Sequence, residues 1–181
     1  MTMKNRQKGF TLMEILVVVT ILGIMAVVGV NQYVQSAEAQ RAELGADLVS
    51  QVAHANLLYY AEHTAYVSGA ITNTLCAGQS ACPSGSGGCS LITCGYLKMR
   101  NFDNQPYMVW AGNGSAGSPA CGDGGISSMN PANVVACGRR RKNTDTGSYG
   151  TSNATYGAWG YTMDINGAVG KLGTGAPGFS Q

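Results

Sequence analysis

Lys8-Gly9-Phe10-Thr11-Leu12-Met13-Glu14 places a basic residue, a glycine and one carboxylate at the start of a long apolar run. From Phe10 to Val30 the only ionisable side chain is that of Glu14. A helix of about 21 residues is roughly 32 Å long, enough to cross the hydrocarbon core of a bilayer. The basic residues Lys4, Arg6 and Lys8 precede this run. Because positive charge stays on the cytoplasmic side, the residues after Val30 are predicted to face outward.

Glu14 is an unusual residue for such a segment. An ionised carboxylate in an apolar helix is unfavourable by up to roughly 2.5–3.5 kcal/mol at mid-membrane, and by less near a helix end. Cleavage after Gly9 would create a new α-amino group on Phe10. In an assembly of parallel, axially offset helices, that amine could neutralise Glu14 of a neighbouring copy.

These residues resemble the type IV prepilin signature, which type IV pilins share with the pseudopilins of type II secretion and DNA-uptake systems. The resemblance extends from Lys8 to about Tyr33, and it departs from many family members in having Asn31 in place of a proline. It implies that a membrane aspartyl peptidase cuts between Gly9 and Phe10 and methylates the new N-terminal Phe10. It also implies that Glu14 guides assembly.

The N-terminus has two other possible interpretations. A secretory signal peptide would use Ala37-Glu38-Ala39 as its cleavage site, but its apolar region would exceed the usual 7–15 residues and would contain Glu14. An uncleaved membrane anchor explains the length and the basic flank, but it leaves Gly9-Phe10 and Glu14 unexplained.

The chain is predicted to fold as one exported α+β domain on a helical stalk. Residues 1–9 form a cleaved cytoplasmic leader, 10–30 the transmembrane and filament-core helix, 31–66 its amphipathic continuation, and 67–181 the globular domain. The leader holds three of the 11 Lys and Arg residues, which leaves eight positive against nine negative side chains. With only 11% charged residues and 26 glycines, the mature chain is predicted to have a loop-rich surface packed beside other copies.

The helix is predicted to continue to about His63. An apolar stripe with helical spacing is formed by Leu44, Leu48, Val52, Ala55 and Tyr59, whereas Arg41, Asp47, Gln51 and Asn56 fall elsewhere around the axis. Gly23, Gly29 and Gly45 either weaken the helix locally or permit close contact with it; the sequence leaves both open.

Six cysteines lie on the predicted outward side, where disulfides form. Cys76, Cys82, Cys89 and Cys94 stand in a Gly- and Ser-rich segment, 71–95, and we expect them to pair among themselves; Cys121 is expected to pair with Cys137. Six cysteines allow 15 pairings, which sequence alone does not resolve. A zinc site is disfavoured because no Cys-x-x-Cys pair occurs.

No cofactor or metal is expected, and the chain is not predicted to be an enzyme. His54 and His63 are nine residues apart on the helix and complete no metal-binding motif. Asp164-Ile165-Asn166-Gly167 resembles part of a calcium loop, but further ligands are not evident, so a plain turn is favoured.

The globular domain is predicted to contain a small antiparallel sheet. Strand-like composition occurs at 96–100, 107–111, 158–164 and 168–172, and Asn166-Gly167 is a hairpin signal between the last two. The run Arg139-Arg140-Arg141-Lys142 is predicted to lie in a loop after Cys137. It is either a solvated loop, a contact with a neighbouring subunit or a DNA-binding patch, and the last is weakly supported because no aromatic residues are interleaved.

Together these features predict a major or minor pilin, a structural subunit of a type IV pilus-like filament. It would cross the inner membrane once, with its C-terminus outside, before it joins an extracellular filament. The expected partners are other copies, other pilins, the prepilin peptidase and an inner-membrane assembly platform. The alternatives are a pseudopilin in a periplasmic pseudopilus and a membrane-tethered adhesin or binding module that never polymerises.

Overall fold

The computed structural model describes residues 10–82, 87–115, 133–141, 159–173 and 176–178. Its elements are α1 (Leu12–His63), β1 (Gly69–Ile71), α2 (Asn73–Cys76), η1 (Gly87–Cys89), α3 (Ser90–Thr93), β2 (Tyr107–Ala111), β3 (Val134–Arg140), β4 (Gly160–Asp164) and β5 (Val169–Leu172). The chain divides into two compact units, Met1–Glu38 and Ala39–Gln181. The fold class is α+β, as predicted.

Helix α1 runs without a break through position 31 to its end, which confirms the predicted continuous helix. It begins after Thr11, whose hydroxyl accepts a hydrogen bond from the Glu14 N–H at 3.3 Å and so caps the helix. It ends where Thr64 adopts a left-handed φ of 55° while its N–H still bonds the Tyr60 carbonyl at 2.8 Å.

The part of α1 in the second unit packs on the sheet through one face. Leu48, Val52, Ala55 and Tyr59 are buried, as the predicted stripe requires. Leu44 is 54% exposed, so its place in that stripe was wrong. At 100° per residue Leu44 lies just outside the arc centred on positions 45, 49, 52 and 56, the arc that faces the sheet.

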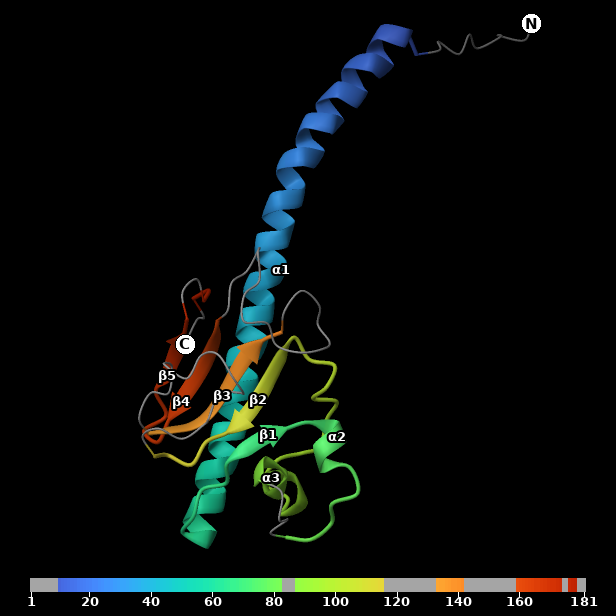
Figure 1. The fold of residues 1–181 in the computed structure, drawn as a ribbon. Coiled ribbons are helices and arrows are strands. Elements are labelled where there is room, and N and C mark those ends of the chain that lie inside the picture. Colours follow the sequence, from blue (N-terminus) through green and yellow to red (C-terminus); the bar gives the residue numbers. More distant parts are fainter. Residues whose placement is uncertain (1–9, 83–86, 116–132, 142–158, 174–175, 179–181) are drawn as a thin grey trace, which may run out of the picture. The chain divides into compact units, whose positions relative to one another are not determined.

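Within the described residues the sheet has five strands in the order β1-β2-β3-β4-β5, and every neighbouring pair is antiparallel (Figure 1). The predicted strand at 107–111 is β2, and those at 158–164 and 168–172 correspond to β4 and β5. Strands β1 and β3 were not predicted. A bulge interrupts the β3–β4 register between Val134 and Ala136.

The predicted strand at 96–100 was wrong: this segment is a turn followed by irregular chain. Gly95 has a φ of 83°, which turns the chain directly after Cys94. The Leu97 N–H then bonds back to the Leu91 carbonyl at 2.8 Å, and the Leu97 side chain is buried. This local turn uses the backbone group that a strand ladder would need.

The predicted hairpin between β4 and β5 is present, with three residues, 165–167, between Asp164 and Ala168, which pair at its base. The Ala168 carbonyl accepts from the Asp164 N–H, and the Asp164 carbonyl accepts from the Gly167 N–H, both at 3.1 Å. Among the described non-glycine residues positive φ occurs only at Thr64 and Asn133, so Gly167, with a φ of 84°, alone takes the left-handed conformation in this turn. This is a turn closed by a glycine bulge rather than a two-residue turn.

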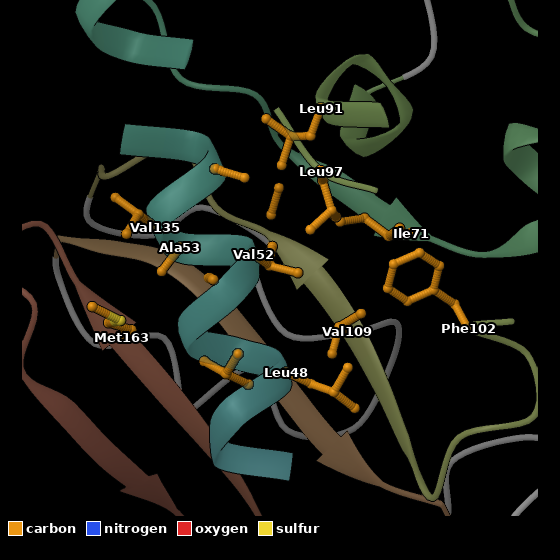
Figure 2. Packing of buried hydrophobic residues seen from close by; sticks show 14 of the residues in the cluster. Leu48, Val52, Ala53, Ile71, Leu91, Leu97, Phe102, Val109, Val135 and Met163 are labelled. Carbon is orange, nitrogen blue, oxygen red and sulfur yellow. The ribbon is translucent and has the colours of Figure 1, made fainter. Parts of the chain in front are cut away.

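The core lies between α1 and one face of the sheet. Figure 2 shows Leu48, Val52 and Ala53 of α1 among Val109, Val135 and Met163 of the strands, with Leu91 and Leu97 beyond them. Close approach depends on two glycines. A Cβ on Gly45 would lie 2.5 Å from the Tyr107 ring, and a Cβ on Gly138 would lie 2.7 Å from a Val49 methyl. Gly45 therefore permits close packing, one of its two predicted roles, whereas Gly23 and Gly29 have no neighbour within 4 Å.

The Cys- and Gly-rich segment folds into short helices joined by two disulfides. Cys76 bonds Cys89 and Cys82 bonds Cys94, which confirms that these four pair among themselves. Cys137 is also disulfide-bonded. Its predicted partner, Cys121, lies outside the described residues, so that pairing stays a prediction.

Candidate functional site: the exposed N-terminal helix

The first unit contains an apolar helix surface that is exposed around the whole axis. Its large apolar side chains are exposed to solvent, with relative exposures from 37% at Val34 to 85% at Leu12. These exposed residues are Phe10, Leu12, Met13, Ile15, Leu16, Val17, Val18, Val19, Ile21, Leu22, Ile24, Met25, Val27, Val28, Val30, Tyr33 and Val34. A soluble surface rarely carries such a continuous patch. This helix is therefore built for an apolar environment outside its own fold.

Thr20 is a polar residue within this surface whose hydroxyl is satisfied locally. The Thr20 hydroxyl donates to the Val17 carbonyl at 2.7 Å, so it brings no unpaired donor into lipid or into a helix bundle. An 18-residue stretch of α1 is strongly apolar, and none of it is buried inside the structure. By length and composition, α1 is the one described helix able to cross a membrane.

Glu14 lies in the first turn of α1, and its side chain is exposed. It is the third helical residue after the cap, Thr11, so Thr11-Leu12-Met13-Glu14 matches a Thr-x-x-Glu capping box. The N-terminus of a helix also attracts negative charge through its dipole. That Thr11 caps the helix was not predicted, although the Thr-x-x-Glu pattern in the sequence indicates such a cap.

Phe10 directly precedes the cap and is 78% exposed. Gly9 and the leader, residues 1–9, lie outside the described residues. The structure thus has an accessible Phe10 directly before the helix cap and a carboxylate, that of Glu14, in the first turn of the helix.

Comparison with known protein families finds a match, and it lies in this segment. Residues 4–30 match the family described as the prokaryotic N-terminal methylation motif. These residues carry the prepilin-type signature of type IV pilins and pseudopilins. No curated protein and no solved structure matches the chain.

The prepilin-type signature supports a pilin-like or pseudopilin subunit, a structural class rather than an enzyme. Together with the exposed apolar helix, it fits a protein anchored in a membrane before assembly. It also implies processing by prepilin peptidase and assembly with other pilins.

The basic run does not form the predicted loop. Arg139 and Arg140 belong to β3, and Arg139, Arg140 and Arg141 are all about 5% exposed or less. The Arg140 guanidinium donates to the Pro106 carbonyl at 3.1 Å. That of Arg141 donates to the carbonyls of Gln105 at 2.7 Å and Phe102 at 3.2 Å. The side chains of Arg140 and Arg141 thus serve the fold, because backbone carbonyls replace their water, and Arg139 is buried beside them in β3; Lys142 lies outside the described residues.

Burial lowers the pKa of Arg141, and the nearby carboxylate of Asp103 acts in the opposite direction. Asp103 also accepts from the N–H and the hydroxyl of Thr74, both at 3.2 Å. Arg141 and Asp103 thus help to tie the loop before β2 to β3 and α2.

Among the described residues no group of three His, Cys, Asp or Glu could hold a metal ion. Asp164, in the segment that resembles a calcium loop, uses Oδ1 to accept from the N–H groups of Asn166 at 2.9 Å and Ala168 at 2.8 Å. Its carboxylate thus stabilises the hairpin turn, in keeping with the plain turn favoured from sequence.

The two histidines lie apart and have local partners. The His54 ring nitrogen Nδ1 lies 2.8 Å from the Ser50 carbonyl on the same helix. His63 stacks on Tyr59 with ring centroids 4.2 Å apart, and its Nε2 lies 3.3 Å from the Tyr96 hydroxyl. Tyr96 donates to Glu62, and this hydrogen bond is the main cause that raises the pKa of Tyr96 to about 12.

Proposed function

We propose that this chain is a structural subunit, a major or minor pilin, of a type IV pilus-like extracellular filament. One observation carries the proposal: the methylation motif at residues 4–30 coincides with a fully exposed apolar helix that bears a single carboxylate in its first turn. A membrane anchor alone would need the apolar surface but not the acid.

Maturation would begin at the leader. Prepilin peptidase would cleave between Gly9 and Phe10 and methylate the new α-amino group of Phe10. Phe10 is exposed and precedes the helix cap, so the bond before it lies next to the start of α1 rather than within its hydrogen-bonded turns. The chain is thus the substrate of the peptidase and does no chemistry of its own.

Assembly would transfer the apolar helix from lipid into a bundle of identical helices. Because lipid tails and leucine side chains are similarly apolar, close packing and polar pairing must supply the preference for the bundle. The positive N-terminus of Phe10 in one subunit would pair with Glu14 of its neighbour. A buried charge without a partner is strongly unfavourable, so this pair would favour one axial offset between subunits.

The second unit would form the outward part of the filament. Its disulfides are consistent with an oxidising compartment beyond the inner membrane. This location agrees with the topology expected from the basic leader.

The test combines electron microscopy of sheared surface material with mass spectrometry of the chain's N-terminus. Long fibres that contain this chain with an N-methylated Phe10 are expected. The same processed end in a chain that never forms surface fibres would favour a pseudopilin. An intact Met1 would rule out the processed subunit and favour a membrane-tethered binding module.

A further inference from the structure

Within the part of the chain that the structure describes, strand β1 stands at one end of the sheet and pairs only with β2. An end strand presents backbone N–H and C=O groups that can pair with the sheet of another molecule. This hazard is greatest for a protein held at high local concentration. Natural proteins cover such an edge with another segment or interrupt it.

The backbone of η1 lies directly against β1. A Cβ on Gly88 would lie 2.6 Å from the Gly69 carbonyl oxygen and 3.0 Å from that of Ala70. A Cβ on Gly87 would lie 2.5 Å from the Ser68 carbonyl oxygen. Only glycine permits this approach, so the glycines of this segment have a steric purpose beyond loop flexibility.

The two disulfides of the segment differ in burial. Cys76 and Cys89 are 6% and 1% exposed and belong to the hydrophobic core, whereas Cys82 is exposed and Cys94 only partly buried. Cys89 directly follows Gly88 in η1, so the Cys76–Cys89 bond fixes the glycines that touch β1. The Cys82–Cys94 bond lies farther out.

We propose that η1, held by the Cys76–Cys89 disulfide, is an edge guard that prevents β1 from pairing with the sheet of a second copy of this chain. An opened β1 edge would pair with a second copy of this chain, because an exposed edge strand is a template for another chain and copies of this protein are the chains nearest to it at high concentration. The guard does not depend on the filament proposal, since it follows from the contacts between η1 and β1 alone.

The experiment uses the full chain in detergent micelles and two pairs of variants. Cys76→Ala with Cys89→Ala releases the guard, and Cys82→Ala with Cys94→Ala is the matched control. Gly88→Ala wedges η1 away from β1 with both disulfides intact. Gly178→Ala is its control, because a Cβ there meets only the end of the Lys171 side chain at 3.9 Å.

Hydrogen exchange of peptides that contain β1 is compared with exchange of β4, and self-association is followed by light scattering against protein concentration. In the released variant and in Gly88→Ala, β1 is expected to exchange about tenfold faster or more, β4 to remain protected, and self-association to increase. Both controls should behave like the unmodified protein.

Unchanged β1 exchange would overturn the proposal, and so would an exposed β1 without added self-association. Equal effects from the two cysteine pairs would show that Cys76–Cys89 has no special role and would likewise overturn it. If the released variant also loses β4 protection, it has unfolded, and Gly88→Ala then decides by the same two measurements.

Discussion

The side-chain amide of Asn56 pairs with the backbone of Val67 in both directions. Its Oδ1 accepts from the Val67 N–H at 2.9 Å, and its Nδ2 donates to the Val67 carbonyl at 3.0 Å. Nδ2 also lies 2.8 Å from the Gly112 carbonyl oxygen and 2.9 Å from that of Val135. One fully buried polar side chain thus joins α1 to the chain before β1, to the end of β2 and to β3.

Replacing Asn56 with Ala should therefore lower the free energy of unfolding by about 3 kcal/mol or more, because several buried backbone groups would lose their partner. Asn56→Asp should be at least as harmful, since an oxygen would replace Nδ2 among three carbonyl oxygens. Denaturant unfolding of the full chain in detergent measures both. His54→Ala, an exposed change on the same helix, should stay within about 0.5 kcal/mol. A small loss at Asn56 would refute its central structural role.

Replacing Gly45 with a larger residue is expected to destabilise the fold, although Gly45 lies within a helix. Alanine would improve helix propensity by about 0.5–1 kcal/mol, but its Cβ would overlap the Tyr107 ring, and overpacking costs typically 1–3 kcal/mol. We expect a net destabilisation of about 1 kcal/mol. Tyr107→Leu should remove most of the penalty in a double-mutant cycle. Additive effects of the two substitutions would show that the ring does not oppose residue 45.

Stability should depend on pH through Tyr96 in the alkaline range. Its hydrogen bond to Glu62 raises the pKa of Tyr96 from 10.0 to about 12, so the folded state favours the neutral phenol. This contribution is present below pH 10.0 and disappears as the pH rises through about 12. Tyrosinate formation can be followed by ultraviolet absorbance as the pH rises. The titration curve of the Tyr96→Phe variant, subtracted from that of the unmodified protein, should leave the ionisation of Tyr96 at high pH. Glu62→Gln should move that ionisation to lower pH, and an unchanged midpoint would exclude Glu62 as its cause.

Features encoded by local patterns were predictable from the sequence. The long helix follows from its apolar run and spacing, and the β4–β5 hairpin follows from Asn166-Gly167. The candidate site was also accessible in this way, because Phe10 and Glu14 stand out in a short stretch of sequence.

Features that depend on distant partners were not predictable. Asn56 was expected to fall away from the apolar stripe of α1, yet it is fully buried, and its partners are 11 to 79 residues away in sequence. Arg141 was expected on a loop. Its burial could not be predicted, because the carbonyls that accept its hydrogen bonds belong to Phe102 and Gln105, which are far from it in the sequence. Strand β3 was missed since Gly138 lowers strand propensity, whereas the Val49 side chain leaves room only for a glycine at position 138.

Glu14→Ala should separate processing from assembly. The Gly9–Phe10 bond is untouched by this change, so cleavage and methylation should remain largely intact. Filament formation should fall strongly, because the Phe10 amine of each incoming subunit would lack its carboxylate partner. Mass spectrometry measures the processed end, and electron microscopy measures the filaments. Gln35→Ala, an exposed polar change on the same helix, is the control for general effects on α1.

Gly9→Val should block processing while the residue proposed for assembly is kept, because it alters the cleavage site and leaves Glu14 in place. This variant should retain its first nine residues and should accumulate in the membrane without filaments. Wild-type-like filaments from Glu14→Ala would refute the register role of the carboxylate while leaving the processed subunit intact. Normal maturation of Gly9→Val would instead remove the cleavage assignment, and with it the new amine on which the pairing depends.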